Sequence, residues 1–214
     1  IKPDMVFNAS HVHSEISSGI IHAAKYLKIK TCTFLFSWDN LTSQGRMTPT
    51  YNYYLCWNND IKDDLLRIYP TTKKEQVYVT GTSQFDFHFD EKYYQSKNEF
   101  CEIHKLDPQR PIILYTTAQE RQSIGEEMIV ERLADIISEL KMKNKPQLLV
   151  RIYPKDLSNR FNQLIDSQKE IIFPAIPWIK NYETPHPEDS FLYTNMLRHC
   201  DLGINIASTI SIEL

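Results

Sequence analysis

Short apolar runs alternate with amphipathic stretches along most of this chain. The runs are rich in β-branched and aromatic residues, a composition typical of strands. They predict strands over residues 5–9, 31–37, 51–57, 76–80, 112–115, 148–152, 170–173 and 202–206. Between them, helical periodicity predicts helices over residues 14–27, 58–69, 126–142, 159–167 and 188–200. Strands that alternate with helices predict parallel sheets built from right-handed βαβ units.

The alternation is interrupted once, between residues 85 and 106, where the chain is polar and aromatic and lacks a strand pattern. It restarts near Pro111, which favours two sheets over one. We therefore predict an α/β protein with two Rossmann-like parallel-sheet domains: 1–86, a helical linker over 87–107, and 108–214. Ile1 directly precedes a core strand, and Leu214 falls about one turn into a helix expected after Ser208, so we expect both domains to be incomplete.

Composition and charge exclude several classes of protein. The net charge is −3 and the basic residues are scattered, which argues against nucleic-acid binding. The four cysteines are far apart and predict reduced thiols in a cytoplasmic protein. The longest apolar run is too short to cross a bilayer. Dinucleotide-binding, P-loop and nucleophile-elbow motifs do not occur, which argues against dehydrogenases, P-loop NTPases and serine esterases.

In open parallel sheets, ligands bind beyond the carboxyl ends of the strands. At the last predicted strand, the backbone N–H groups and hydroxyls of Ser208 and Thr209 form a candidate phosphate cradle. Glu213 follows about one turn later, where a carboxylate could accept hydrogen bonds from ribose hydroxyls. The alternative is an ordinary helix start, with Ser208 as the cap.

Two further candidates follow other strands of the second half. Arg151 ends an apolar strand, so it must either pair with an acid or meet an anionic ligand. If it meets a ligand, the substitution Arg151→Ala should weaken binding of a nucleoside diphosphate without disturbing the fold. Thr116 and Thr117 follow the strand at 112–115 and form a polar loop beside the same edge.

In the first half, two loops offer candidate bases. His11 and His13 lie between a strand and a helix, where a histidine could act as a general base or simply be a solvated capping residue. The H-x-H spacing lacks a third ligand, so no metal site is expected. The loop 37–45 contains Asp39 and suits either the hydroxyls of a sugar or an Asx-rich turn.

Several of these segments together resemble the GT-B glycosyltransferase superfamily, in particular bacterial surface-polysaccharide transferases. The segments are SWDNLTSQG (37–45), YLCWNNDIKDDLLRIYP (54–70), VTGTSQFD (79–86), PIILYTTAQ (111–119), LLVRIYPKD (148–156) and DLGINIASTISIEL (201–214). They cover nearly the whole chain in the family's order, from the later part of the acceptor-side domain into the donor domain. One departure is Ile206-Ala207, which replaces the usual glycine-rich turn.

The resemblance implies roles for individual residues. Ser208 and Thr209 match the phosphate-binding helix start, and Glu213 matches the glutamate that binds the ribose. Arg151 resembles the basic residue that faces the donor diphosphate. The loop 175–178, which contains Pro177, corresponds to the segment beside the nucleobase. His13 or Asp39 would deprotonate an acceptor hydroxyl, with no metal and with no cofactor beyond the nucleotide-sugar substrate.

The expected function is therefore transfer of a sugar from a nucleotide-sugar to a hydroxyl acceptor in the synthesis of capsule, lipopolysaccharide or another surface glycan. Alternatives on the same fold are a glycerophosphotransferase and a UDP-sugar 2-epimerase. An alternative of another class is a non-catalytic domain that binds a nucleotide-sugar or a protein. The expected partners are a nucleotide-sugar and a glycan acceptor, with no nucleic acid. The expected location is the cytoplasm, with peripheral attachment to the inner face of the membrane left open.

Overall fold

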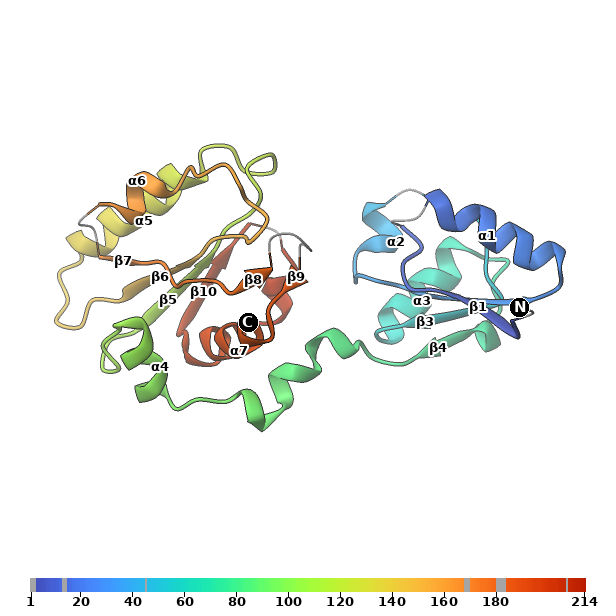
Figure 1. The fold of residues 1–214 in the computed structure, drawn as a ribbon, viewed down its shortest axis with the longest axis horizontal. Helices are drawn as coiled ribbons and strands as arrows, with labels where there is room; N and C mark the ends of the chain where they lie inside the picture. The colour runs from blue at the N-terminus through green and yellow to red at the C-terminus, as the bar shows by residue number, and fades with distance from the viewer. Residues whose placement is uncertain (1–2, 13–14, 45, 168–169, 180–183, 207) are drawn as a thin grey trace. The chain divides into compact units, whose positions relative to one another are not determined.

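The computed structural model describes residues 3–12, 15–44, 46–167, 170–179, 184–206 and 208–214. The chain divides into two compact units, residues 1–84 and 85–214. Each unit contains a four-stranded sheet in which all strands are parallel, and Figure 1 shows the two sheets. The predicted fold class, α/β with two Rossmann-like domains, is confirmed.

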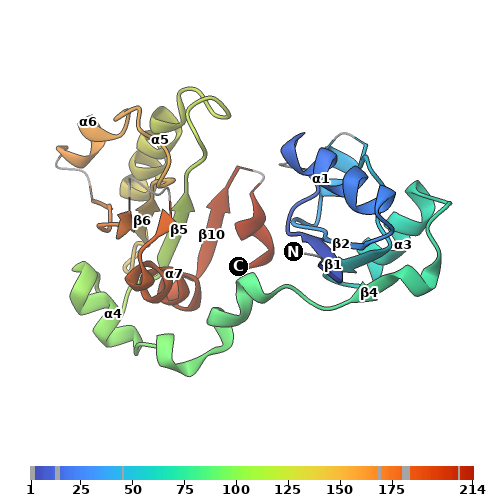
Figure 2. The same cartoon turned by 45° about the vertical axis from the view of Figure 1, so that its right-hand side comes forward.

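In the first unit, the strand order is the order of the sequence. The strands β1 (Met5–Asn8), β2 (Lys30–Phe34), β3 (Tyr53–Cys56) and β4 (Val77–Val79) pair as β1-β2-β3-β4. Their connections contain α1 (Glu15–Tyr26), α2 (Asn40–Ser43), α3 (Asn59–Ile68) and the 3₁₀ turn η1 (Lys74–Gln76). Figure 2 shows α1 and α3 beside the strands that they connect.

The helix α3 illustrates how the sequence builds this unit. Asn58 caps it, because the side-chain oxygen accepts a hydrogen bond from the backbone N–H of Ile61 at 2.9 Å. Ile61 and Leu65 are four residues apart and both are buried toward the sheet. The helix ends at Ile68, two residues before Pro70, which could not continue it.

In the second unit, the order of the strands across the sheet does not follow the sequence, because the last strand lies beside the first. The strands β5 (Ile112–Thr116), β6 (Gln147–Arg151), β7 (Ile171–Ile172) and β10 (Leu202–Asn205) pair as β10-β5-β6-β7. The helices α5 (Glu126–Glu139) and α6 (Asn162–Ile165) cover one face, whereas α4 (Lys97–His104) and α7 (Pro187–His199) cover the other (Figure 1). A short antiparallel pair, β8 (Trp178–Ile179) and β9 (Thr184–Pro185), precedes α7.

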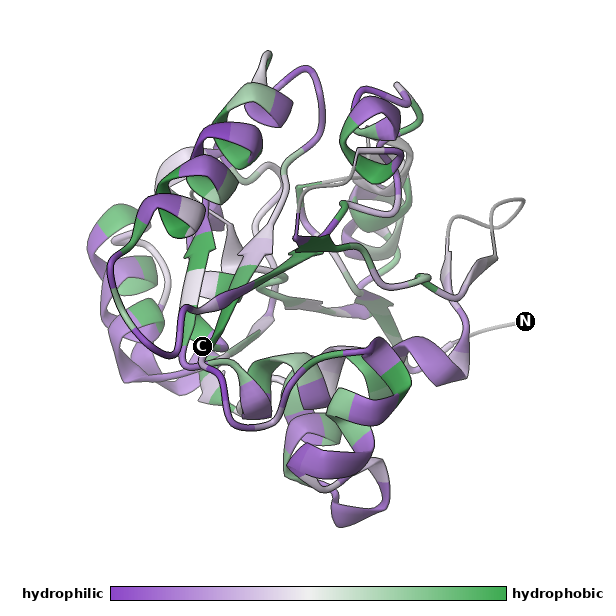
Figure 3. Cartoon of the chain, turned by 90° about the vertical axis from the view of Figure 1, so that its left-hand side faces the viewer, coloured by the Kyte–Doolittle hydropathy of each residue, from purple (hydrophilic) through white to green (hydrophobic). Residues whose placement is uncertain are grey.

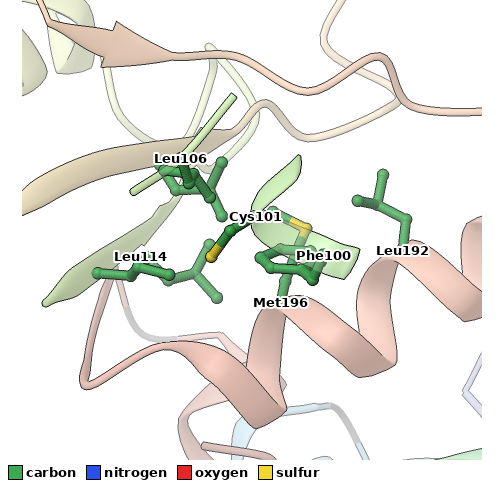
Figure 4. Packing of buried hydrophobic residues seen from close by; sticks show 8 residues of the cluster. Phe100, Cys101, Leu106, Leu114, Leu192 and Met196 are labelled. Atoms are coloured by element: carbon green, nitrogen blue, oxygen red, sulfur yellow. The ribbon is translucent and has the colours of Figure 1, made fainter. Parts of the chain in front are cut away.

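Side-chain alternation along the strands divides the second core into two layers. Leu114 and Leu149 face α4 and α7, and they pack with Phe100 and Met196. Figure 4 shows Leu114, Phe100 and Met196 in this layer. Tyr115, the next residue in β5, faces α5 and α6. In Figure 3 several strands are green along much of their length, and the helices around them alternate between hydrophobic and hydrophilic bands.

The segment expected to be a linker is packed onto the second unit. It contains the 3₁₀ turns η2 (Ser83–Phe89) and η3 (Glu91–Tyr93), followed by α4. The Asn195 side chain on α7 accepts a hydrogen bond from the N–H of Gln95 and donates one to the carbonyl of Tyr93, both at 2.8 Å. Phe100 is fully buried. Residues 85–106 therefore belong to the second unit, and three of them, Phe100, Cys101 and Leu106, lie in its core.

Two predicted helices are shorter than expected. The helix predicted over 159–167 is reduced to α6, because Asn159 has a φ of 59°, in the left-handed region that a right-handed helix excludes. The helix expected after Ser208 is the 3₁₀ turn η5 (Thr209–Ile212).

Candidate active site

The carboxyl edge of the second sheet has a topological switch point between β5 and β10. The chain leaves β5 toward α5 on one face of the sheet. It leaves β10 toward the opposite face. The Leu214 side chain, which follows β10, lies against Gly203. The register partner of Gly203 is Leu114, which belongs to the layer of α4 and α7. Strands whose connections diverge in this way mark the ligand site of open α/β sheets.

Three polar residues lie side by side at this edge. Asn205 of β10 pairs in register with Thr116 of β5, and Thr116 pairs with Arg151 of β6, so their side chains share one face. The hydroxyl of Thr116 is buried and has no hydrogen-bond partner among the described residues. A buried hydroxyl without a partner is costly, which makes Thr116 the strongest candidate for a ligand contact.

Arg151 is engaged with an acid on α7. Its two terminal nitrogens lie 2.9 Å and 2.8 Å from the two carboxylate oxygens of Asp189, and both side chains are buried. The guanidinium also lies over the ring of Tyr193, 4.9 Å from its centroid. Of the two alternatives drawn from the sequence, the structure shows the acid partner. The pair with Asp189 uses two of the five N–H donors of the guanidinium, and binding of a diphosphate by Arg151 stays a prediction.

The side chain of Glu213 also has hydrogen-bond partners within the protein. Its Oε2 lies 2.8 Å from Nε2 of His88, and it accepts a hydrogen bond from the Tyr193 hydroxyl. Burial, followed by the negative charge of Glu213, raises the pKa of Tyr193, which therefore stays protonated and donates this bond. The carboxylate expected to meet ribose is thus turned toward protein partners.

The candidate phosphate cradle is a capped turn. The Ser208 hydroxyl accepts a hydrogen bond from the N–H of Ile210 at 3.3 Å, and the N–H of Ser208 donates to the side-chain oxygen of Asn205 at 3.3 Å. This is the capping alternative, in a turn of four residues. Thr209 begins that turn, and phosphate binding by Ser208 and Thr209 stays a prediction.

The two remaining predicted residues of this half support the loops at the edge. The Thr117 hydroxyl accepts a hydrogen bond from the N–H of Tyr153 at 2.8 Å, and its own N–H donates to the Arg151 carbonyl at 3.0 Å. Thr117 thus ties the exit of β5 to the exit of β6. The carbonyl of Pro177, which directly precedes β8, accepts a hydrogen bond from the N–H of His186 at 3.1 Å.

Sequence analysis missed a buried cluster of charged side chains, around Glu126 and Arg160, that forms hydrogen bonds to the loop after β5. Glu126, at the start of α5, is fully buried and accepts hydrogen bonds from the N–H of Ala118, the Tyr115 hydroxyl and Arg160. Burial raises the pKa of Glu126, although these hydrogen bonds and the charge of Arg160 oppose the rise. Arg160 also donates to the carbonyl of Ala118 and to Asp156. No local pattern links residues 126 and 160, so only the fold reveals this cluster.

In the first unit, Asp39 forms the core of a turn. Its carboxylate accepts hydrogen bonds from the hydroxyls of Ser37 at 2.6 Å and Ser43 at 2.7 Å. Partial burial acts to raise the pKa of Asp39, but these hydroxyls outweigh it and lower the pKa below its usual value. These contacts correspond to the Asx-rich turn alternative, and the lowered pKa makes the carboxylate a weak base. His13, the other predicted base, lies outside the described residues.

Among the residues that the structure describes, no group of three or more histidine, cysteine or acidic side chains is arranged to hold a metal ion. None of the described helices is both long enough and apolar enough to span a bilayer.

Comparison with known proteins gives a likeness of fold. No family model and no curated protein sequence matches the chain. Among solved structures, the S. aureus MnaA–UDP co-structure aligns with 97% of this chain and 54% of its own, with a TM-score of 0.62 and 16% identity. The UDP-GlcNAc 2-epimerase from Neisseria meningitidis, bound to UDP-GlcNAc, gives a TM-score of 0.63, 14% identity, and coverage of 97% and 56%.

A third solved structure, the UDP-GlcNAc 2-epimerase from Methanocaldococcus jannaschii, gives a TM-score of 0.56 at 16% identity, with coverage of 95% of this chain and 56% of its own. The chain spans about half the length of these solved structures. At these identities the likeness concerns the fold. The chain has the GT-B-like α/β fold that these solved structures share.

Proposed function

We propose that this chain is part of an enzyme that acts on a UDP-sugar, and that the enzyme is a UDP-sugar 2-epimerase. The observation that carries the proposal is the likeness over at least 95% of the chain to solved 2-epimerases, one of them bound to UDP-GlcNAc. This favours the 2-epimerase alternative over the glycosyltransferase that the sequence suggested first.

The second unit supports a nucleotide site at the switch point of its sheet. The buried Thr116 hydroxyl has no partner among the described residues and could donate to a phosphate oxygen. The turn 208–212 follows β10, the strand beside β5, so the N–H of Thr209 and the Ser208 hydroxyl are candidates for further phosphate contacts. Arg151 and Asp189 would then stabilise the edge from within the protein.

Inversion at C2 requires that the C2–H bond breaks and that a proton returns on the opposite face of the sugar. Because C2 is not next to a carbonyl, the electron pair of that bond has to form a C1–C2 double bond while the C1–O bond to UDP breaks, and UDP adds back at C1 when the proton returns to C2. Such a reaction needs a general base and a general acid whose pKa values are suited to the working pH. The lowered pKa of Asp39 makes it a poor base. The assignment of His13 or Asp39 as the base stays a prediction.

The test is the fate of the hydrogen at C2. The complete protein is incubated with UDP-GlcNAc in D₂O, and the sugar is followed by proton NMR. The proposal predicts deuterium at C2 together with the appearance of the C2 epimer. If UDP-GlcNAc is bound and turned over with its C2 hydrogen retained, the 2-epimerase proposal is wrong.

Glycosyl transfer is the second candidate, because the segments 37–45 and 54–70 resemble those of the transferases. A transferase would leave the C2 hydrogen in place and release UDP when an acceptor is present. A glycerophosphotransferase would instead cleave a bond at phosphorus. Binding without turnover would favour a non-catalytic protein. One set of NMR and product measurements therefore separates all four outcomes.

A further inference from the structure

The second unit contains a largely buried pair of titratable side chains, His88 and Glu213, and the sequence analysis gave no role to His88. The imidazole Nε2 lies 2.8 Å from Oε2 of Glu213, and the two side chains are only 13% and 8% exposed. The other imidazole nitrogen, Nδ1, lies 3.4 Å from the hydroxyl of Thr194. Tyr193 adds a second hydrogen bond to the carboxylate. Two segments that are far apart in the sequence, around His88 and Tyr193, thus meet at Glu213.

This pair lies close to the proposed nucleotide site. Glu213 ends the turn that leaves β10, and β10 forms one side of the switch point. The ring of Tyr193 lies between Glu213, to which it donates, and the guanidinium of Arg151, which stands over its face. Arg151 belongs to the polar row at the carboxyl edge. Tyr193 therefore links Glu213 to Arg151 at that edge.

Aromatic rings pack around His88, whereas Glu213 lies at the end of a short 3₁₀ turn. The His88 ring packs on Phe87, with 4.0 Å between centroids, and on Tyr193, with 5.4 Å between centroids. Tyr93, close to Phe87, packs on Phe191 of α7 at 4.9 Å. Glu213, in contrast, follows a 3₁₀ turn of four residues. Any rearrangement of the pair should therefore be a movement of Glu213.

A buried carboxylate with two side-chain partners can accept ribose hydroxyls only by giving up an existing partner or by moving. We propose that His88 acts as a gate on the nucleotide site: it holds Glu213 in a closed position, and ribose binds when Glu213 exchanges His88 for the ribose hydroxyls. This inference rests on the proposed function, because it requires that the site takes a nucleotide. His88 touches Glu213 and not the substrate, so its role is regulatory.

The gate lowers the affinity for ribonucleotides, because only the open fraction of the protein binds. Removal of the imidazole should therefore tighten binding of UDP. It should not tighten binding of 2′,3′-dideoxy-UDP, which has no ribose hydroxyls to offer and gains nothing from an open Glu213. A purely structural role for His88 would change the affinity for both nucleotides alike.

The experiment is calorimetric titration of the complete protein with UDP and with 2′,3′-dideoxy-UDP. The variants are His88→Ala and His88→Asn, and the control is His22→Ala, an exposed histidine on α1. We expect His88→Ala to bind UDP about three- to tenfold more tightly than the unmodified protein, with no gain for the dideoxy compound. His88→Asn, whose side chain is too short to reach Glu213, should behave in the same way and provides the test if His88→Ala does not fold.

The outcomes separate the two proposals. If neither the unmodified protein nor any variant binds UDP, the proposed function fails. If UDP binds, but removal of the imidazole leaves its affinity unchanged, weakens it, or tightens both nucleotides equally, the gate is overturned while the function stands.

Discussion

Thr116 and Thr117 are adjacent at the end of β5 and differ completely in their hydrogen bonds. The Thr117 hydroxyl accepts the N–H of Tyr153, whereas the Thr116 hydroxyl has no partner among the described residues. Both residues are buried. Valine has nearly the same shape as threonine, so substitution to valine isolates the hydroxyl at each position.

We expect Thr116→Val to leave the free energy of unfolding unchanged or to raise it by about 1 kcal/mol, because it removes a buried hydroxyl without a partner. The same change should weaken UDP binding. Thr117→Val, the matched control, should lower the free energy of unfolding by about 1–3 kcal/mol, because it leaves the N–H of Tyr153 without its acceptor. Urea unfolding and titration with UDP measure both effects. A Thr116→Val variant with unchanged UDP affinity would remove Thr116 from the site.

Arg151 illustrates how a buried pair changes the expected result of a mutation. Arg151→Ala would leave Asp189 buried without its cation, so we expect a loss of about 3–5 kcal/mol in the free energy of unfolding. The double variant Arg151→Met, Asp189→Leu removes both charges and should recover most of that loss. Chemical denaturation of the two variants is the measurement. A single variant with near-native stability and weakened UDP binding would restore the role expected from the sequence.

At the scale of elements, α4 and α7 meet around Phe100. Its ring lies between His104 and His199, with centroid distances of 4.7 Å and 5.4 Å. Burial lowers the pKa of both histidines; for His199, a hydrogen bond to the Gln95 carbonyl opposes the effect of burial. The folded protein therefore binds fewer protons at these sites than the unfolded chain does.

A lowered histidine pKa contributes stability above the ordinary value, about 6.5, and this contribution is lost as the pH falls. We therefore expect the two histidines to make the free energy of unfolding decrease as the pH falls from 7.5 to 5.5. In His104→Leu this decrease should be smaller, since one of the two groups no longer titrates. Urea titrations of both proteins at the two pH values test this. An identical decrease in the two proteins would show that His104 has no part in it.

The sequence predicted the positions of strands and helices better than it predicted which side chains contact one another. Short apolar runs rich in β-branched and aromatic residues located all eight strands of the two parallel sheets, because this pattern is local. It could not reveal that Arg151 pairs with Asp189, 38 positions away, or that His88 meets Glu213, 125 positions away. Such contacts depend on tertiary packing. The short helix α6 was also mispredicted, because periodicity does not reveal a left-handed residue such as Asn159.

At the scale of the whole molecule, the structure divides the chain between Gln84 and Phe85. Phe100, Cys101 and Leu106 complete the core layer that covers Leu114 and Leu149. A fragment of residues 85–214 should therefore fold cooperatively, whereas a fragment of residues 108–214, the domain predicted from the sequence, should expose that layer and be unstable. Circular dichroism during thermal unfolding distinguishes them. Equal cooperativity in both fragments would contradict the division.

The central claim is that the carboxyl edge of the second sheet, at the switch point between β5 and β10, binds a UDP-sugar. Amide hydrogen exchange of the complete protein, with and without saturating UDP, tests it most directly. The account predicts slower exchange in peptides covering residues 116–119 and 205–213 when UDP is bound. Protection by UDP that leaves both of these segments unchanged would contradict it.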